Sequence, residues 1–332
     1  MVSLFLLCRL QIANMKSLSK NILILSIAIL FSTSLALPQT NRTVAVTFDD
    51  LPTVSQFGEL AVRQQITKDL LAHVTKAGVP AIGFVNERKL YKDDKLIDSE
   101  VALLQQWIDA GLELGNHTYS HRSLHNIPLE DYLADIAKGE PITDKLLRNA
   151  GMKLRYFRHP FLHTGLTIET KSGVSKYLKE HGYTIAPVSI DNADYIFAAA
   201  YDKAKIKGDE ALRKRIAEAY IPYMEAKTEY WERQSVRLFG REIAQTLLIH
   251  ANSINAELFG DLAKMFKNRG YEFVTLEEAL KDEAYRLPDE FTGRAGISWI
   301  HRWVLARDRS LLVEDEPFVP EFVMEASGFD SQ

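Results

Sequence analysis

Two neighbouring aspartates and two histidines spaced four residues apart are the side chains in this sequence best suited to hold a metal ion. Asp49 and Asp50 follow an apolar run, and His117 and His121 are separated by three residues. Histidines at i and i+4 share one face of a helix or turn, so both imidazoles can bind one ion. A carboxylate of the aspartate pair is the nearest third ligand. Such a set leaves open positions, which a hydrolytic zinc ion needs in order to bind water and polarise a carbonyl.

Each half of this set also has an ordinary structural explanation. A single HxxxH pair is more often a capping or core-edge pair than a metal site, and adjacent aspartates are common at helix N-caps and turns. Neighbours in a strand point to opposite faces, so Asp49 and Asp50 can face one site only where the strand gives way to a loop. His125 continues the four-residue spacing, and we expect a surface residue there rather than a fourth ligand.

The elements that must position these residues alternate between strand-like and helical segments. Amphipathic helical patterns cover 60–77, 98–110, 129–149, 170–181 and 255–269. This alternation predicts right-handed crossovers and a parallel sheet, either a barrel one unit short of eight or a doubly wound sheet. The seven predicted strands are 43–48, 80–86, 112–116, 154–158, 183–190, 245–250 and 271–275.

Ionisable residues collect at the predicted carboxyl ends of five strands, where parallel α/β folds carry their chemistry. Chance placement would scatter such residues along the helices as well. The strand ends deliver Asp49-Asp50, Asn116-His117, Arg158-His159-Pro160-Phe161, Asp191 to Tyr195, and His250.

These strand-end segments resemble the motifs of polysaccharide deacetylases, the NodB-homology or carbohydrate esterase 4 family. The resemblance implies a distorted (β/α)7 barrel and removal of acetyl groups from chitin, peptidoglycan or xylan with zinc or another divalent ion. All five family motifs occur in order over about residues 43–250: TFDD (47–50), NHTYSH (116–121), RHPF (158–161), DNADY (191–195) and LLIH (247–250).

The resemblance also implies the metal ligands and the base. Asp50, His117 and His121 would bind the divalent metal, with Zn²⁺ as the first choice. Asp49 would take a proton from the metal-bound water that attacks the acetyl carbonyl. Arg158 would pair with Asp49, lower the pKa of that carboxyl and hold it in place.

The remaining implied roles concern the oxyanion, the leaving group and the acetyl methyl. The metal and the backbone N–H of Phe161 would stabilise the tetrahedral oxyanion. His250 would protonate the departing amine and would be oriented by Asp194. Tyr195 would receive the acetyl methyl.

The sequence departs from the family pattern at four places without removing a catalytic group. Leu51-Pro52 stand where glycine is usual, which we expect to add bulk near the metal. Phe161 replaces tyrosine and keeps its backbone donor, Tyr195 replaces tryptophan, and Ala251 follows His250 where aspartate is common. These departures leave the substrate open.

Two segments fall outside the strand–helix alternation. Residues 200–242 have helical spacing interrupted by Pro222, and we expect a helical insertion that partly covers the groove and favours chain ends or short oligosaccharides. Residues 285–332 contain Trp299 and Trp303 and are expected to pack on the barrel as a C-terminal extension. The catalytic domain is therefore expected to cover 37–284.

The composition excludes several protein classes. With 46% hydrophobic and 25% charged residues, the chain is neither collagen-like nor low-complexity. A sequence pI near 6.2 offers no basic footprint for nucleic acid. A single cysteine, Cys8, excludes a disulfide framework.

The N-terminus has the pattern of a secretory signal peptide covering residues 1–36. Lys16 and Lys20 precede the apolar run NILILSIAILF (21–31), which is short for a membrane span, and Ser34-Leu35-Ala36 offers a cleavage site after Ala36. We expect Met15 to be the true start, and an uncleaved anchor is the alternative. Residues 1–36 hold three basic residues and no acidic one, so their removal changes the net charge from −4 to −7.

The sequence therefore predicts an exported, periplasmic or extracellular, metal-dependent deacetylase of N-acetylated amino-sugar glycans. Its partner would be an acetylated glycan, with no nucleic acid and no stable membrane insertion after cleavage. An O-acetyl esterase or a small cyclic-amide hydrolase on the same fold is one alternative. A catalytically silent glycan-binding module is another, although it leaves the base, the acid and the three ligands without a purpose. A non-haem iron oxygenase could share two histidines and a carboxylate but needs neither Asp49 nor His250.

Overall fold

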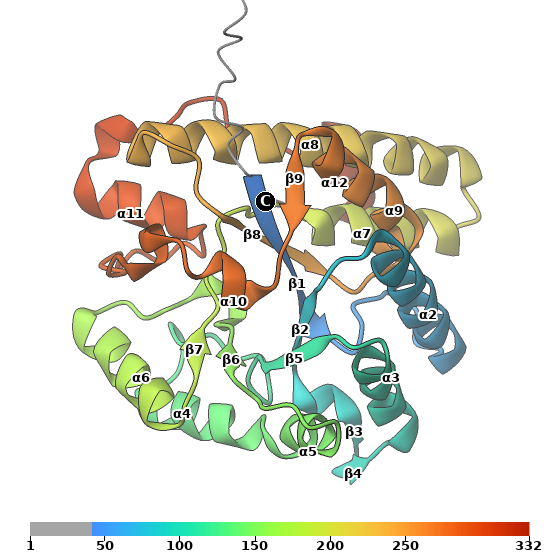
Figure 1. Cartoon of the computed structure of the whole chain (residues 1–332). Coiled ribbons are helices and arrows are strands. Elements are labelled where there is room, and N and C mark those ends of the chain that lie inside the picture. Colours follow the sequence, from blue (N-terminus) through green and yellow to red (C-terminus); the bar gives the residue numbers. More distant parts are fainter. Residues whose placement is uncertain (1–41, 332) are drawn as a thin grey trace, which may run out of the picture. The chain divides into compact units, whose positions relative to one another are not determined.

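The computed structural model describes residues 42–331, which form a curled parallel sheet surrounded by helices (Figure 1). The expected signal peptide, residues 1–36, lies outside the described residues. All seven predicted strands are present, as is an unpredicted two-stranded hairpin of β3 (Tyr91–Lys92) and β4 (Lys95–Leu96). The seven strands of the main sheet are β1 (Arg42–Leu51), β2 (Ile82–Val85), β5 (Glu113–Asn116), β6 (Tyr156–Phe157), β7 (Thr184–Ile185), β8 (Gln245–His250) and β9 (Tyr271–Phe273).

The sheet curls until its two edges meet. Its order is β7-β6-β5-β2-β1-β8, and β9 pairs with the first residues of β1. The segment that follows β7 leaves β6 at Ala186 and forms a parallel bridge from Ile190 to Leu247 of β8. Because one segment touches both edges, the strands enclose a small, irregular barrel. The predicted distorted barrel is confirmed.

Helices cover the outside of this barrel and largely follow the predicted ranges. The predicted helix 129–149 is instead two helices, because Pro141 starts a new one and the backbone of Thr118 passes too close to Gly139 for any side chain there. The covering helices are α2 (Leu60–Ala77), α3 (Asp98–Asp109), α4 (Leu129–Lys138), α5 (Pro141–Asn149), α6 (Ile168–Glu180), α9 (Ser253–Asn268) and the short α10 (Leu276–Ala279), with one-turn helices η1 (Glu87–Leu90), η2 (Pro160–Leu162), η3 (Glu283–Arg286) and η4 (Arg309–Leu311).

The expected insertion forms the crossover into β8. It consists of α7 (Asp194–Ile206) and α8 (Glu210–Phe239), and α8 continues through Pro222. Tyr220 of α8 bonds Asn255 at the start of α9, at 2.6 Å. Further along the helix, Glu232 lies 3.5 Å from Arg42 at the start of β1. The helix therefore runs along the outside of the barrel from one end toward the other, and the expectation that it covers the groove is wrong for α8.

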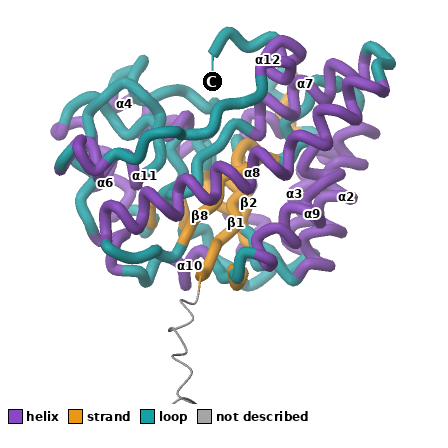
Figure 2. Tube along the Cα trace, turned by 90° about the horizontal axis from the view of Figure 1, so that it is seen from above, coloured by secondary structure: helices purple, strands orange, loops and turns teal. Residues whose placement is uncertain are grey.

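The C-terminal segment packs on the barrel through α11 (Trp299–Arg307) and on α7 through α12 (Glu321–Ser327). The N–H of Trp299 donates to Val188 at 2.7 Å, and the Lys203 ammonium of α7 donates to the Ser327 carbonyl at 2.5 Å. Figure 2 shows α12 at the end of the barrel opposite the start of β1. This segment, rather than α8, lies at the end where the strands terminate.

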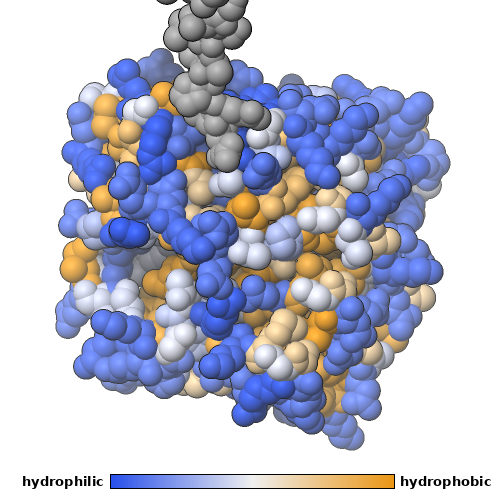
Figure 3. Space-filling view, viewed as in Figure 1, coloured by the Kyte–Doolittle hydropathy of each residue, from blue (hydrophilic) through white to orange (hydrophobic). Residues whose placement is uncertain are grey.

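The face seen in Figure 3 is hydrophilic around its periphery, with apolar side chains gathered toward the middle. No helix within residues 42–331 is long and apolar enough to cross a membrane.

Candidate active site

The last residues of β1 turn both aspartates toward one site. Asp49 is aligned with His250 of β8, whereas Asp50 has a left-handed φ of 65°. The pairing with β2 shifts register between Phe48 and Leu51. This irregularity breaks the strict alternation of the strand, as a bulge does. Neighbouring carboxylates can therefore approach the same histidines.

Asp50, His117 and His121 form a compact cluster of potential metal ligands. One ligand atom of each residue lies within 4.8 Å of the others. The Nε2 atoms of His117 and His121 lie 3.6 and 3.2 Å from Oδ1 of Asp50. His117 follows β5 directly, and the turn after it reverses through left-handed Thr118 and His121, which brings the second imidazole back beside the first.

Hydrogen bonding leaves His117 free to act as a ligand. Its Nδ1 lies 2.8 Å from the Arg158 carbonyl oxygen, which can only accept, so Nδ1 carries the proton. In the neutral ring, Nε2 then has its lone pair directed toward Asp50. Burial lowers the pKa of His117 and of His121 to about 4, so both imidazoles are neutral at pH 7.

The cluster fits a divalent cation. Oδ1 of Asp50 is buried and has no hydrogen-bond partner among the described residues, which is costly unless a cation binds there. Burial raises the pKa of Asp50, but the Lys89 ammonium and the two imidazoles, which are protonated at the low pH where Asp50 titrates, outweigh it and hold this pKa well below its usual range. One carboxylate and two neutral imidazoles are a donor set typical of catalytic zinc sites.

Arg158 holds Asp49 beside the cluster. Its Nη1 lies 3.2 Å from both oxygens of Asp49, its Nη2 donates to Thr47 at 3.0 Å, and its Nε donates to Ala186 at 2.8 Å. Asp49 is only 3% exposed, and this burial raises its pKa more than Arg158 lowers it. The pKa of Asp49 is therefore above its usual value, contrary to the expected net decrease, and the carboxylate is a stronger base for that reason.

His250 and Asp194 form a second pair on the other side of Asp49. Nδ1 of His250 lies 2.8 Å from Oδ1 of Asp194, and the His250 N–H donates to Oδ2 at 2.8 Å. Asn252 and Asn255 also donate to Oδ2, at 3.0 and 2.8 Å. Burial alone would lower the pKa of His250, but the charge and hydrogen bond of Asp194 raise it to about 9. The imidazole is therefore protonated at neutral pH and able to donate.

Two aromatic residues flank the cluster. Phe161 is 52% exposed, has a left-handed φ of 57°, and places its ring 4.4 Å from that of His121. No acceptor for its N–H occurs in the described part of the chain. Tyr195 lies on the opposite side, 6.3 Å from the His250 ring, and its ring also lies 5.5 Å from that of Phe329.

Three other residues weighed from the sequence lie outside the cluster. Leu51 is fully buried in the core, where its side chain approaches Gly83, and it is not part of the ligand group. Ala251 is also buried, and its carbonyl accepts from Val54 at 2.8 Å. His125 stacks on His163 at 4.0 Å and is not part of the ligand group.

Sequence reasoning assigned no role to three residues that support the site from behind. Thr47 bonds Arg158, Lys89 donates to the Asp50 carbonyl at 2.6 Å, and Asn255 bonds Asp194. Thr47 lies within the TFDD motif, and Asn252, which caps α9 and also bonds Asp194, is of a residue type common at helix N-caps. Lys89 and Phe329 come from distant parts of the chain, and no local pattern marks them.

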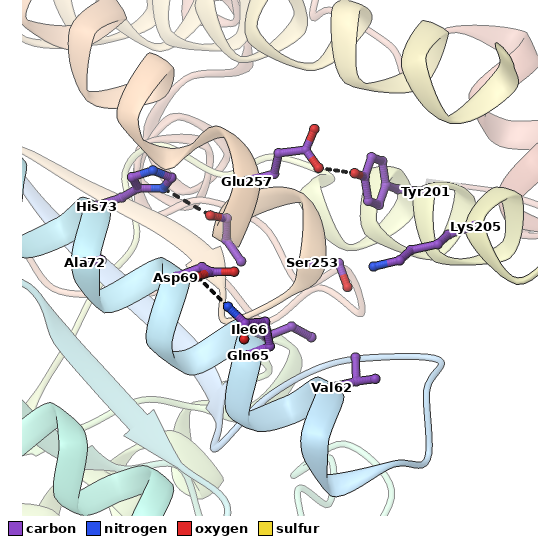
Figure 4. Close-up of a pocket in the computed structure, with 11 residues that line it drawn as sticks. Val62, Gln65, Ile66, Asp69, Ala72, His73, Tyr201, Lys205, Ser253 and Glu257 are labelled. Carbon is purple, nitrogen blue, oxygen red and sulfur yellow. Dashed lines mark hydrogen bonds between the residues drawn. The ribbon is translucent and has the colours of Figure 1, made fainter. Parts of the chain in front are cut away.

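Two cavities lie apart from this cluster. One, of about 360 Å³, lies between α2, α7 and α9 (Figure 4), where Gln65 bonds Asp69, His73 bonds the Ala256 carbonyl and Tyr201 bonds Glu257. The other, of about 740 Å³, lies between α6, β7 and the segment after α10. Neither is lined by a proposed metal ligand or by Asp49.

Comparison with known proteins gives a match over slightly less than half of the chain. The family model for polysaccharide deacetylase matches residues 36–186. A peptidoglycan-N-acetylglucosamine deacetylase from Bacillus cereus is 30% identical over 158 residues, which cover 48% of this chain and 48% of the relative. The chain therefore matches about half the length of this curated relative.

Solved structures with partial similarity include two esterases and one pseudoenzyme. A family 4 carbohydrate esterase from Streptomyces lividans has 20% identity and a TM-score of 0.43, covering 73% of this chain and 96% of that one. A family 4 acetyl xylan esterase from Clostridium thermocellum has 22% identity and a TM-score of 0.46, covering 72% and 91%. A CE4 family pseudoenzyme from Bacillus anthracis has 15% identity and a TM-score of 0.48, covering 73% and 66%. With TM-scores below 0.5, these likenesses say nothing about function.

The matched range contains Asp49, Asp50, both histidines of the cluster and Arg158. Over residues 36–186, the chain is similar to polysaccharide deacetylases.

Proposed function

We propose that the protein is an exported, metal-dependent deacetylase that hydrolyses acetamido groups of N-acetylated amino-sugar glycans such as peptidoglycan or chitin-like polymers. The observation that carries the proposal is the adjacency of two different carboxylate environments. Asp50 lies among two neutral imidazoles, while Asp49, one residue away, is buried against Arg158. One serves a cation and the other remains free to accept a proton.

The residues divide the work of amide hydrolysis without a covalent intermediate. Asp50, His117 and His121 hold the divalent metal, with Zn²⁺ as first choice, and when bound it supplies Lewis-acid polarisation of the acetyl carbonyl and activation of water. Asp49 accepts the proton of the attacking water, and its raised pKa suits it to that task. Arg158 keeps Asp49 oriented through the three acceptors that its guanidinium bonds.

Other residues of the site stabilise the oxyanion and protonate the leaving amine. As the carbon–oxygen bond forms, the Phe161 N–H donates to the developing oxyanion. His250, charged and held by Asp194, gives its proton to the nitrogen as the carbon–nitrogen bond breaks. Acetate and a free amine leave, and Tyr195 lines the space for the acetyl methyl. Each group has a proposed role in one step of the reaction, which supports hydrolysis over glycan binding alone.

The cellular location is part of the proposal and rests on residues 1–36. Their basic and apolar pattern, followed by small residues at 34 and 36, supports export to the periplasm or cell exterior. Acetylated envelope glycans occur there, whereas cytosolic metabolites do not. Sequencing the N-terminus of the exported protein tests this, with Leu37 expected as the first residue.

Acetate release from three substrates tests the activity. Purified protein is incubated with N-acetylglucosamine oligomers, peptidoglycan and acetylxylan, in metal-stripped and zinc-restored form. We expect release from the amide substrates only with zinc, and its loss in Asp49→Asn with zinc binding retained.

The alternative functions predict different results in the same assay. Release from acetylxylan alone would favour an O-acetyl esterase. Zinc binding and glycan binding without release from any substrate would favour a catalytically silent binding module. Release that persists in Asp49→Asn would contradict the proposed base.

A further inference from the structure

The turn that carries Phe161 has an unusual backbone. Phe161 and Leu162 are consecutive residues with left-handed φ values of 57° and 55°, and neither is a glycine. A side chain disfavours this conformation, so it persists only where the surroundings hold it. Contacts from the C-terminal segment, which lies beyond the matched family range, help to hold this turn.

Arg302 of α11 bonds the turn directly. Its Nη1 donates to the Leu162 carbonyl at 3.2 Å, and its Nη2 donates to the Thr164 hydroxyl. Its Nε donates to Asp289 at 3.1 Å. Arg302 is only 2% exposed, so its donors have little access to water and depend on these partners.

Two further residues complete the attachment. Asp289 accepts from the Thr164 hydroxyl at 3.0 Å and from the Lys171 ammonium of α6 at 2.5 Å. Lys171 also donates to Thr164 at 2.8 Å. The acid of the C-terminal segment therefore lies between two cations, one from each side of the contact, and buried charges are retained where they are paired in this way.

Gly296 provides an independent steric contact. A Cβ atom added at Gly296 would lie 1.8 Å from the carbonyl oxygen of Phe161. The backbones of these two residues therefore touch, and only glycine allows this distance. Any larger residue at 296 must displace the Phe161 turn or the segment itself.

We propose that residues 289–302 are a positioning element of the active site. Gly296 and Arg302 hold the Phe161 turn in the conformation in which its ring contacts His121 and its N–H is left without an acceptor. This inference rests on the proposed function for its catalytic consequence, whereas the physical attachment can be measured without any activity.

The sharpest test is Gly296→Ala in the otherwise unchanged protein. We expect kcat to fall at least tenfold, since loss of a whole oxyanion donor costs about 100- to 1,000-fold, while KM and the zinc dissociation constant stay within twofold. Both an activated phenyl acetate and an acetamido substrate form an oxyanion, but the departing phenolate needs no proton from His250. If the defect lies in the oxyanion donor, Gly296→Ala should therefore lower kcat equally for the two substrates. Gly58→Ala is the matched control, since a Cβ there meets nothing within 4 Å.

A readout independent of activity is hydrogen–deuterium exchange of the peptide covering 159–165. We expect at least tenfold faster exchange in Gly296→Ala and in Arg302→Lys, which keeps the charge but cannot reach Leu162, Thr164 and Asp289 together. The exposed Arg309→Lys on the same segment should leave exchange unchanged.

Exchange that is unchanged in both variants, or an unchanged kcat in Gly296→Ala, would overturn the inference. So would a loss of kcat that only tracks the fraction of unfolded protein. If the wild-type protein released no acetate at all, the proposed function would fail, and the exchange experiment would still decide whether this segment holds the turn.

Discussion

At the scale of single residues, Arg158 connects parts of the barrel in addition to neutralising Asp49. It is fully buried and bonds a carboxylate and a hydroxyl of β1, on Asp49 and Thr47, and the backbone carbonyl of Ala186 just after β7. Its guanidinium is planar and presents donors in fixed directions, which a lysine ammonium cannot do. Arg158 therefore joins barrel strands as well as orienting the base.

Replacing Arg158 by lysine should destabilise the protein by about 2–4 kcal/mol, because buried acceptors lose their donors. Urea unfolding of both proteins measures the difference. The matched control is Arg148→Lys, whose side chain is 68% exposed in a helical pair with Asp144 and which should change stability by less than about 0.5 kcal/mol. Equal effects of the two substitutions would show that Arg158 acts on catalysis alone.

Replacing Asp194 by asparagine should move the alkaline limb of the activity profile. His250 must be protonated to donate, and its raised pKa of about 9 keeps it so at neutral pH. Activity should therefore decline as pH rises through about 9 in the wild-type protein. The substitution removes the charge that raises this pKa, so the decline should begin at least about one pH unit lower.

The pH dependence of kcat measures this shift, because it reports the enzyme–substrate complex. The control is Asp202→Asn, a buried aspartate of the same helix that bonds Ser55 and Gln56 instead of His250. An alkaline limb that stays in place in Asp194→Asn would exclude His250 as the acid.

At the scale of elements, the carboxyl ends of the parallel strands bring the candidate catalytic residues together, as the parallel arrangement predicts. Asp49 and His250 come from adjacent strands in register, so the proposed base and the proposed acid lie side by side although about 200 residues separate their strands in the chain. Two helices, α7 and α12, also contribute side chains at this end of the barrel. α7 begins with Asp194 and Tyr195, and α12 packs against α7 and ends just before Phe329.

Phe329 extends the aromatic wall that Tyr195 begins. It lies 5.5 Å from Tyr195 and is 44% exposed, so a sugar ring seated against Tyr195 can also contact it. Phe329→Ala should raise KM for N-acetylglucosamine oligomers by about three- to tenfold, as expected for the loss of one aromatic contact. It should leave kcat and the KM of a phenyl acetate unchanged.

Phe318→Ala is the control for this variant. Phe318 belongs to the same segment and is 77% exposed, but it makes no ring contact with Tyr195 or His250. Steady-state kinetics on the oligomers should not distinguish it from the wild-type protein. The same KM in both variants would place the sugar away from α12.

At the scale of the whole molecule, local sequence patterns predicted the alternating strands and helices. They missed the contacts between residues that lie far apart in the chain. Strand–helix alternation predicted all seven strands, because apolar period and turn residues are written locally. The break before Pro141 has a local signal, since proline starts a new helix, but the steric need for glycine at 139 comes from the distant Thr118. Lys89, Gly296 and Phe329 were missed for the same reason, since each depends on a partner far along the chain.

The proposed metal ligands also come from distant segments, so ion binding should stabilise the whole barrel. Asp50 ends β1, and His117 and His121 follow β5. An ion that binds only the folded chain adds about 2.7 kcal/mol at a free concentration 100 times its Kd, which should raise Tm by about 5 °C. Thermal unfolding of metal-stripped and zinc-restored protein measures the rise. Asp50→Asn should abolish it, whereas His125→Ala should retain it, because His125 stacks on His163 outside the ligand group. An equal rise in Asp50→Asn would place the zinc elsewhere on the chain.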